Sequence, residues 1–445
     1  MLCLAYHFPP VGGAGVQRTL KFVRYLPRFD YEPIVLTGPG NPVGRWTPTD
    51  ETLVDELPDE ATVVRVEQPE PPPATAGRAR IERWLQLESP FARWWQTGIV
   101  AGGARIRDVD LVYASMSPFE TGPAAAEVAA TLDVPLVADF RDPWALDEMT
   151  VYPTALHRRR ELGRMRGVLT AAGAVVMNTP EAVRAVVDAF PELRVKRVVS
   201  IPNGYDEDDF GRPPPTRSDG AFRIVHAGYL HTQLGHETRA RSGLRRRLGG
   251  AEPVDIMTRS HVVLLEALER LIAADPSLAD LIELHFAGVL SESDRRALDH
   301  RRFRAQCHGY LPHRAVLELI RSADLLFLPM HDLPRGCRAR VVPGKTYEYL
   351  AAGRPILAAL PDGDARDLLE SIPTARVCRP DDVDGLAAAT MLEVHRFSSE
   401  GRAPTVVASP ALAFERQALT AKLAALFDRT LGGRNGIPEP SQLAR

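Results

Sequence analysis

Short apolar runs alternate with segments of helical apolar spacing along most of this 445-residue chain. Strands that alternate with helices form parallel sheets covered on both faces, and such sheets bind ligands beyond the carboxyl ends of their strands. The pattern therefore predicts an α/β fold with ligand sites at the strand ends. In the first half, strands are expected at 2–8, 33–37, 110–114, 135–139, 174–178 and 197–202.

A turn-rich and then proline-rich stretch at 203–220 interrupts the alternation, which resumes at 222. A chain of this length suits two domains of ordinary size, and two doubly wound halves joined by a hinge enclose one cleft. The expected organisation is an N-terminal Rossmann-like domain over 1–205, a linker over 206–221, a second Rossmann-like domain over 222–408, a closing helix over 409–430 and a tail over 431–445.

Two segments depart from the alternation. The segment 67–79 is rich in proline and alanine and predicts a loop. A solvated, mobile loop is also the favoured interpretation of the insertion at 231–259, and a lid that closes over an anionic ligand is the alternative. This insertion contains several glycines and Arg239, Arg241, Arg245, Arg246 and Arg247.

The composition argues against several classes of function. A formal net charge of -3 gives no sign of nucleic-acid binding. No run of about 18 apolar residues occurs, and a first strand that begins at Met1 leaves no signal peptide, so a soluble protein is expected. The four cysteines lack disulfide or zinc spacing, which predicts a reducing, cytoplasmic location, and Cys3 and Cys307 are expected in the core.

A helix that begins near Gly344 carries a cation and a carboxylate on one face. Lys345 and Glu348 are three residues apart, Gly353 ends the helix, and a buried strand follows at 355–357. Such a pair at the mouth of an α/β unit suits a ligand with both phosphate and hydroxyl groups. An ordinary surface ion pair is the alternative.

A glycine-rich turn joins the first strand to the first helix. Gly12, Gly13 and Gly15 would bring bare backbone N–H groups and the positive helix end to one spot, where an anion could bind. The turn fails as a dinucleotide fingerprint, because Arg18 stands where the third glycine should be and no acidic residue follows the next strand. A tight turn without a ligand is the alternative.

Acidic and basic side chains follow the strand expected at 135–139. Asp139, Arg141 and Asp142 are suited to an acceptor site, in which either carboxylate could orient or deprotonate a hydroxyl group. The alternative is an Asp139–Arg141 pair with Asp142 capping a helix. Ser115 ends the preceding strand and could line the same cleft, although a simple turn is favoured.

Two further patterns remain weak. Asp-x-Asp occurs at 108–110, 362–364 and 382–384, which is too frequent in an acid-rich chain to assign a metal. Trp94 and Trp95 lie in an expected helix. One of them is expected in the core, and the other leaves room for a peripheral membrane or lipid contact.

Four motifs, taken together and in this order, resemble those of family 4 glycosyltransferases. They lie at 8–18, 139–144, 201–206 and 344–357, and the resemblance covers nearly all of the chain except the arginine-rich insertion and the tail. It implies the GT-B fold, in which two Rossmann-like domains face each other across a cleft. It also implies an acceptor held by the first domain, a nucleotide sugar held by the second, transfer with retention of configuration, and neither metal nor other cofactor.

The resemblance also implies roles for individual residues. Glu348 matches the glutamate that binds the ribose hydroxyls, whereas the family's other glutamate falls at Arg340 and is absent, so backbone amides at 342–345 are expected in its place. The implied donor site comprises Gly12, Gly13, Gly15, Gly228, Tyr310, Gly344, Lys345, Thr346 and Glu348, the acceptor site Arg18, Ser115, Asp139 and Arg141, and the catalytic set Asp142, Arg259 and Lys345.

The implied reaction releases a nucleoside diphosphate, UDP or GDP, whose growing charge Lys345 and Arg259 would stabilise. Nothing in the sequence suggests the carboxylate pair of a double displacement, so attack on the face that the leaving group departs from is favoured. A sugar-nucleotide 2-epimerase and a non-catalytic sugar-nucleotide binder are the alternatives. A glycan, a lipid-linked acceptor and a small metabolite all remain open.

Overall fold

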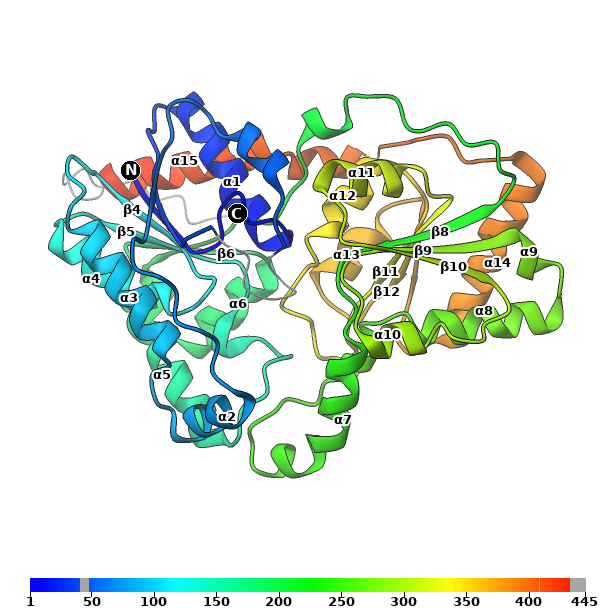
Figure 1. Cartoon of the computed structure of the whole chain (residues 1–445), viewed down its shortest axis with the longest axis horizontal. Coiled ribbons are helices and arrows are strands. Elements are labelled where there is room, and N and C mark those ends of the chain that lie inside the picture. The colour runs from blue at the N-terminus through cyan, green and yellow to red at the C-terminus, as the bar shows by residue number, and fades with distance from the viewer. Residues whose placement is uncertain (41–47, 408, 433–445) are drawn as a thin grey trace.

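Two parallel sheets organise the chain, one in each lobe, with helices on both faces (Figure 1). The structure, a computed structural model, describes residues 1–40, 48–407 and 409–432. Two doubly wound Rossmann-like domains, as predicted, are confirmed. The tail expected beyond residue 432 lies outside the described residues.

The first sheet has the strand order β3-β2-β1-β4-β5-β6-β7. Leu2 of β1 lies opposite both Ile34 and Val112, so the order reverses between β1 and β4 and opens a crevice at their carboxyl ends. The strands are β1 Leu2–Ala5, β2 Ile34–Thr37, β3 Thr62–Arg65, β4 Val112–Ser115, β5 Leu136–Phe140, β6 Ala174–Met177 and β7 Arg197–Ser200.

Helices connect these strands and cover the sheet. The start of α6 shows how local sequence sets a boundary, because the Thr179 hydroxyl accepts a hydrogen bond from the Ala182 amide (3.0 Å) and Pro180 occupies the first turn. The helices are α1 Ala14–Tyr25, α2 Ala76–Leu85, α3 Pro90–Gly103, α4 Thr121–Thr131, α5 Ala155–Ala171 and α6 Pro180–Ala189.

The second sheet has the order β10-β9-β8-β11-β12-β13 and also reverses beside its first strand. Its strands are β8 Phe222–Ala227, β9 Ile282–Ala287, β10 Arg304–Gly309, β11 Leu325–Pro329, β12 Ile356–Ala359 and β13 Ala375–Cys378. The helices are α7 Thr232–Arg247, α8 Val262–Ala274, α9 Leu278–Leu281, α10 Glu292–Arg296, α11 His313–Arg321, α12 Lys345–Ala352, α13 Asp364–Glu370, α14 Val383–Glu400 and α15 Arg416–Gly432.

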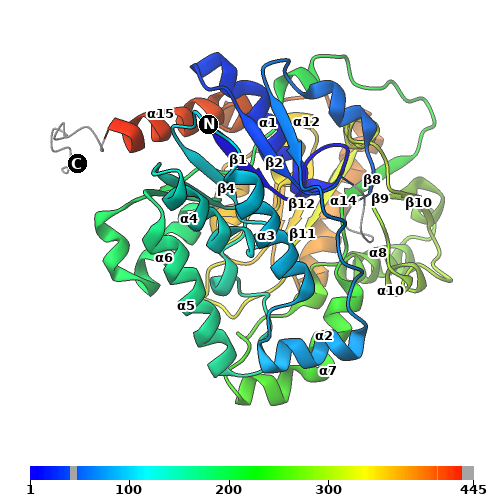
Figure 2. The ribbon, with the colours of Figure 1, turned by 60° about the vertical axis from the view of Figure 1, so that its left-hand side comes forward.

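The closing helix α15 crosses back to the N-terminal lobe and packs beside α1 (Figures 1 and 2). Leu419, Leu423 and Phe427 are buried in one core cluster with Cys3 and Tyr113 of the first sheet. The N-terminal lobe therefore completes its core with the last helix of the chain, which ties the two lobes together.

Two expectations about local structure are wrong, and a third is right only in part. The arginine-rich insertion is not a loop but contains α7, which its arginines favour and in which Gly235 approaches the backbone of Met257 closely. The loop expected at 67–79 is present over 67–75, and α2 takes up its last four residues. Cys307 is exposed on the edge strand β10, whereas Cys3 is buried as expected.

Candidate active site

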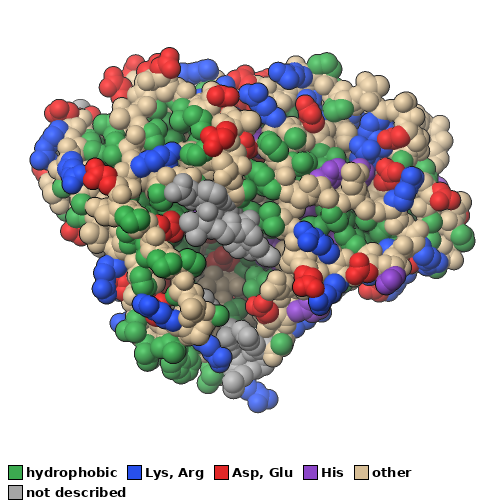
Figure 3. All heavy atoms as spheres, viewed as in Figure 1, with side chains coloured by type: hydrophobic (Ala, Val, Ile, Leu, Met, Phe, Trp, Pro, Cys, Tyr) green, Lys and Arg blue, Asp and Glu red, His purple; other side chains and the backbone are tan. Residues whose placement is uncertain are grey.

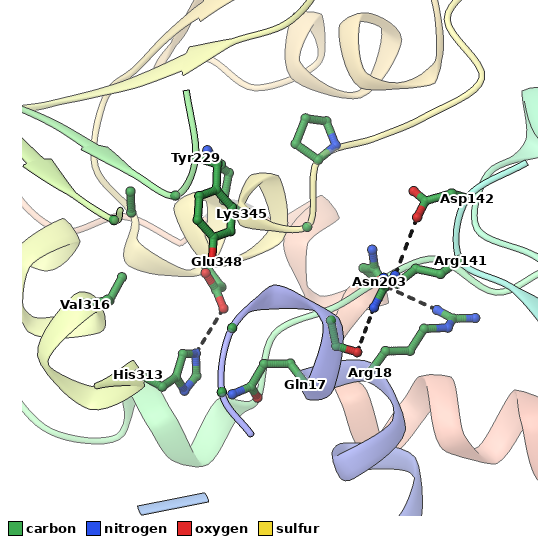
Figure 4. A pocket seen from close by; sticks show the side chains of 18 of the residues that line it. Gln17, Arg18, Arg141, Asp142, Asn203, Tyr229, His313, Val316, Lys345 and Glu348 are labelled. Atoms are coloured by element: carbon green, nitrogen blue, oxygen red, sulfur yellow. Dashed lines mark hydrogen bonds and ion pairs between the residues drawn. The ribbon is translucent and has the colours of Figure 1, made fainter. Parts of the chain in front are cut away.

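A cavity of about 630 Å³ lies between the lobes at the carboxyl ends of both sheets. The loops after β1 and β5 line it from the N-terminal lobe, and the loops after β8, β9 and β10 line it from the C-terminal lobe together with the start of α12. Figure 4 shows side chains of both lobes converging on this space. Doubly wound sheets bind ligands at this edge, so the cavity is the candidate active site.

Lys345 begins α12 and lines the cavity. Its ammonium group lies 3.2 Å from Nε2 of His226, whose Nδ1 lies 3.0 Å from the carbonyl oxygen of Phe327. Because Nδ1 donates to that carbonyl, Nε2 is free to accept from the ammonium group. Burial, together with the charge of Arg259, lowers the pKa of Lys345 to about 7. An anionic ligand would restore the full charge.

Glu348 lines the cavity from the same first turn of α12, three residues after Lys345. Its Oε1 lies 3.1 Å from Nε2 of His313 (Figure 4), and the His313 amide donates to the Asp50 carboxylate (3.1 Å). Burial opposes ionisation of Glu348, but the hydrogen bond and charge of His313 outweigh it and lower the pKa of Glu348 overall. The carboxylate is therefore held ionised, as an acceptor for ligand hydroxyl groups needs to be.

A second cation, Arg259 at the end of the insertion 231–259, also lines the cavity. Arg259 is half-buried, and its Nη1 lies 3.2 Å from Sδ of Met149. Asp147 and Asp142 also line the cavity and favour the charged form of Arg259. Burial, reinforced by the charges of Asp142 and Glu148, raises the pKa of Asp147 to about 7. Lys345 and Arg259 therefore share the cavity with a carboxyl group that titrates near neutral pH.

The glycine-rich turn brings backbone from the N-terminal lobe against the C-terminal lobe. A Cβ atom on Gly12 would lie 2.3 Å from Oη of Tyr310, so only glycine permits this approach. The Gly15 carbonyl accepts a hydrogen bond from Nη1 of Arg141 (2.7 Å). Gly12, Gly13, Gly15, Arg141 and Tyr310 all line the cavity.

Gly228→Ala is expected to weaken diphosphate binding about tenfold. Gly228 has a φ of 107°, in the region that favours glycine, and a Cβ atom there would lie 2.7 Å from Nζ of Lys345. The added methyl group would displace the ammonium group from its position in the cavity, while backbone strain of about 1–3 kcal/mol would lower the stability of the folded protein. Calorimetric titration with UDP and GDP measures the change. Gly220→Ala is the matched control, because Gly220 also has a positive φ but nothing within 4 Å.

Three residues predicted for the site do not line the cavity. Asp139 is buried and bound to Arg18 and Tyr113, so the suggested Asp139–Arg141 pair is also wrong. Ser115 is buried at the end of β4, and Thr346 is buried on the inner side of α12. Since none of these side chains reaches the ligand space, we withdraw acceptor roles for Asp139 and Ser115 and a donor role for Thr346.

Arg18 lines the cavity but has no donor left for a ligand. Its guanidinium group donates to both carboxylate oxygens of Asp139 (2.7 and 2.9 Å) and to the carbonyls of Ile201 (2.8 Å) and Pro202 (2.9 Å). A longer contact to Oδ1 of Asn203 (3.5 Å) engages the fifth N–H. Arg18 therefore ties the end of β5 to the segment after β7 instead of binding an acceptor.

Arg340, which stands where the resemblance expects a glutamate, ties the lobes together. Its amide donates to Glu148 (3.1 Å), and its Nη1 donates to the Leu146 carbonyl (2.5 Å) and lies 3.3 Å from Glu252. The side chain therefore points toward the N-terminal lobe. Residues 341–345 line the cavity, in the place where backbone groups were expected to take over from the missing glutamate.

Several cavity residues were missed in the sequence. Asp147 lies five residues after Asp142. This short distance along the chain was the one local sign that Asp147 could belong to the site. Arg416 reaches the cavity from α15, and no local pattern indicates that this helix returns to the cleft. The other missed polar residues are His7, Gln17, Asp50, Asn178, Asn203, Tyr229, His231 and His313.

One group of potential metal ligands occurs in the described part of the chain, namely Glu56, Asp209 and His313. The Lys21 ammonium group lies 2.5 Å from Glu56, 2.7 Å from Asp206 and 3.5 Å from Asp209. A protein cation already compensates these carboxylates, so the cluster is poorly suited to a metal. The expectation that the site works without a metal stays a prediction.

Trp95 is fully buried and donates to the Thr121 hydroxyl (2.9 Å), as expected for the core member of the Trp pair. Trp94 is half-buried, donates to the Gln68 carbonyl (3.1 Å) and packs against Phe91. Among the described helices, none is long and apolar enough to cross a membrane.

Residues 256–392 match the family model described as "Glycosyl transferases group 1". D-inositol 3-phosphate glycosyltransferase from Geodermatophilus obscurus is 27% identical over 227 residues, which is 46% of this chain and 42% of that relative. The aligned part thus spans less than half the length of the curated relative.

Solved structures resemble the fold over nearly the whole chain. HepE from Anabaena, in complex with UDP and glucose, has a TM-score of 0.57 at 15% identity and covers 96% of this chain and 100% of its own. The UDP-forming α,α-trehalose-phosphate synthase from Burkholderia vietnamiensis has a TM-score of 0.60 at 12% identity, with coverages of 97% and 99%. At these identities the likeness shows the fold alone. The chain has the GT-B fold, and its residues 256–392 match the Glycosyl transferases group 1 family.

Proposed function

We propose that this protein is a retaining glycosyltransferase that transfers a sugar from a UDP- or GDP-linked donor, in the biosynthesis of a glycan or glycoconjugate. The observation that carries the proposal is the position of Lys345 and Glu348, which both line the interlobe cavity from the first turn of α12. The family match includes this helix. UDP in the complex of HepE supports a nucleotide-sugar donor.

In this proposal, α12 binds the diphosphate at its N-terminus. Lys345 and Arg259, which both line the cavity, stabilise the negative charge that develops as the nucleoside diphosphate leaves. Glu348 accepts hydrogen bonds from the ribose hydroxyls, and Tyr310 and Leu311 border the space for the base. Gly12 and Gly13 cover the diphosphate from the N-terminal lobe.

The acceptor enters from the N-terminal side of the cavity. Asp142 and Arg141 lie at that side, and Asp142 is the candidate to orient the attacking hydroxyl group. Retention would follow from attack on the face that the diphosphate leaves, with a donor phosphate oxygen taking the proton. A single product whose anomeric configuration equals that of the donor, observed by NMR, supports this step, and an inverted product overturns it.

The identity of the donor can be tested with the whole protein by thermal-shift titration against nucleoside diphosphates and their sugars. A ligand that binds only the folded form raises the apparent stability by mass action. Stabilisation by one nucleobase series, followed by diphosphate release that depends on an added acceptor, supports the proposal. Release without any acceptor would favour a hydrolase or epimerase reaction, and no stabilisation by any series would contradict the proposal.

Diphosphate binding is expected to weaken as the pH rises above 7. Below that pH Lys345 is protonated and Asp147 is neutral, whereas above it the ammonium group loses its charge and Asp147 becomes an anion. Both changes disfavour an anionic ligand, and each lost proton raises Kd by up to about tenfold per pH unit. Titration of UDP between pH 6 and about pH 9 measures the slope. Lys345→Met should make the dependence of Kd on pH less steep, and adding Asp147→Asn should remove the dependence that remains. A wild-type Kd that does not change with pH would contradict this account.

A further inference from the structure

Helix α2 exposes a row of large apolar side chains. Ile81, Trp84 and Leu85 are 59%, 57% and 55% exposed, and their spacing of three and four residues places them on one helix face. Leu87, just beyond the helix, is 57% exposed, and Leu156 in the neighbouring first turn of α5 is 70% exposed. Clustered exposure of this kind marks an interaction surface more often than single exposed residues do.

This surface, which we call the α2 face, is also basic. Four arginines of α2 and α5 form ion pairs, namely Arg78, Arg158, Arg164 and Arg166, whereas Arg160 is exposed and donates to the Gln86 side chain (3.1 Å). Arg80 and Arg159 are exposed, and Arg78 is exposed beside Glu82. Positive charge and apolar side chains therefore share one face.

The α2 face is held in place by α5. Nε2 of His157 lies 2.9 Å from the Trp84 carbonyl oxygen, and the Gln86 side chain donates to the His157 carbonyl (3.3 Å). The rings of Trp84 and His157 lie 5.3 Å apart. These contacts fix the end of α2, so that the apolar row stays exposed in the folded protein.

We propose that the α2 face docks the protein on a membrane surface rich in anionic lipids. Apolar side chains, tryptophan among them, enter the boundary between headgroups and acyl chains, while arginines beside them bind lipid phosphates and keep their stems in the apolar layer. A second copy of this chain fits less well, because a two-fold contact would place the same basic surface against itself.

The α2 face lies on the same lobe as part of the cavity lining, so docking would also place the cavity relative to the membrane. Asp147 and Met149 line the cavity, and the chain reaches His157 a few residues later. Apolar side chains gather at the lower end of the N-terminal lobe, near the hollow between the lobes (Figure 3). Docking would bring the cavity close to the bilayer. The inference does not depend on the identity of the donor.

Vesicle co-sedimentation of the full chain tests the proposal. The protein is expected to sediment with vesicles of phosphatidylcholine and phosphatidylglycerol, weakly or not at all with phosphatidylcholine alone, and less at high salt. The triple variant Ile81→Ser, Trp84→Ser, Leu85→Ser should lower the partition coefficient at least about tenfold. The matched control is Val195→Ser, Leu392→Ser, Leu412→Ser, which removes apolar side chains that are exposed elsewhere. It should bind as the wild type does.

Thermal unfolding of both triple variants shows whether they are folded. If the first triple variant does not fold, the double variant Arg80→Gln, Arg159→Gln tests separately whether the two exposed arginines contribute to vesicle binding. The proposal is overturned if the wild type does not bind anionic vesicles, or if folded variants of the α2 face bind like the wild type. Sedimentation velocity tests the competing occupant. A dimer that only the α2 variant dissociates would assign the face to a second copy instead.

Discussion

Lys345→Met is expected to lower kcat/KM for the nucleotide-sugar donor by about 10²- to 10³-fold, which is the usual effect of removing one charge-stabilising donor from an active site. The substitution keeps a long side chain on α12 but removes the cation that lines the cavity. Since the diphosphate gains charge as it leaves, the larger part of the loss should appear in kcat. Steady-state assays of diphosphate release measure both constants.

Lys422→Met is the control for this prediction, because Lys422 is exposed on α15. It should leave both constants within about twofold of the wild type, since surface substitutions have small effects. If Lys345→Met kept the wild-type kcat while Glu348→Ala lost activity, the position of the diphosphate in the cavity would need to be revised.

Arg18→Met is expected to lower the free energy of unfolding by about 3–5 kcal/mol, the usual result of leaving one member of a buried ion pair without its partner. Asp139 would then be a buried carboxylate next to Tyr113 without a compensating cation. The carbonyls of Ile201 and Pro202 would also lose their donor. Denaturant unfolding followed by circular dichroism measures the loss.

The double variant Arg18→Met, Asp139→Asn provides the control. It removes the unpaired charge as well and should recover a substantial part of the lost stability. An Arg18→Met protein with wild-type stability and a raised KM for the acceptor would instead support the acceptor role that the sequence suggested for Arg18.

Elements whose signal is local could be predicted from the sequence. The helix α12 is an example, because Gly344 precedes it, Gly353 ends it in the left-handed region at φ 62° and the strand β12 follows. The insertion was misread because glycines and a high charge suggest a loop, whereas arginine is a good helix former and Gly235 packs closely against another segment.

The candidate site was predictable where one short motif carries the chemistry, as for Lys345 and Glu348. It was not predictable where long-range packing decides which side chains reach the cavity. Asp139 and Asp142 are three residues apart, yet one is buried against Arg18 and the other lines the cavity. Arg416 reaches the site because α15 returns across the molecule, which no periodicity within that helix indicates.

Calorimetric titration of nucleoside diphosphates into the wild type and Lys345→Met, in two buffers with different heats of ionisation, tests the central claim most directly. The account predicts that the wild type binds UDP or GDP with uptake of a proton near pH 7, because the ligand restores the charge of Lys345. It also predicts that Lys345→Met binds at least about 100-fold more weakly, without the Lys345 contribution to that uptake. Equal affinity of the two proteins, or no binding of any nucleoside diphosphate to the wild type, would contradict it.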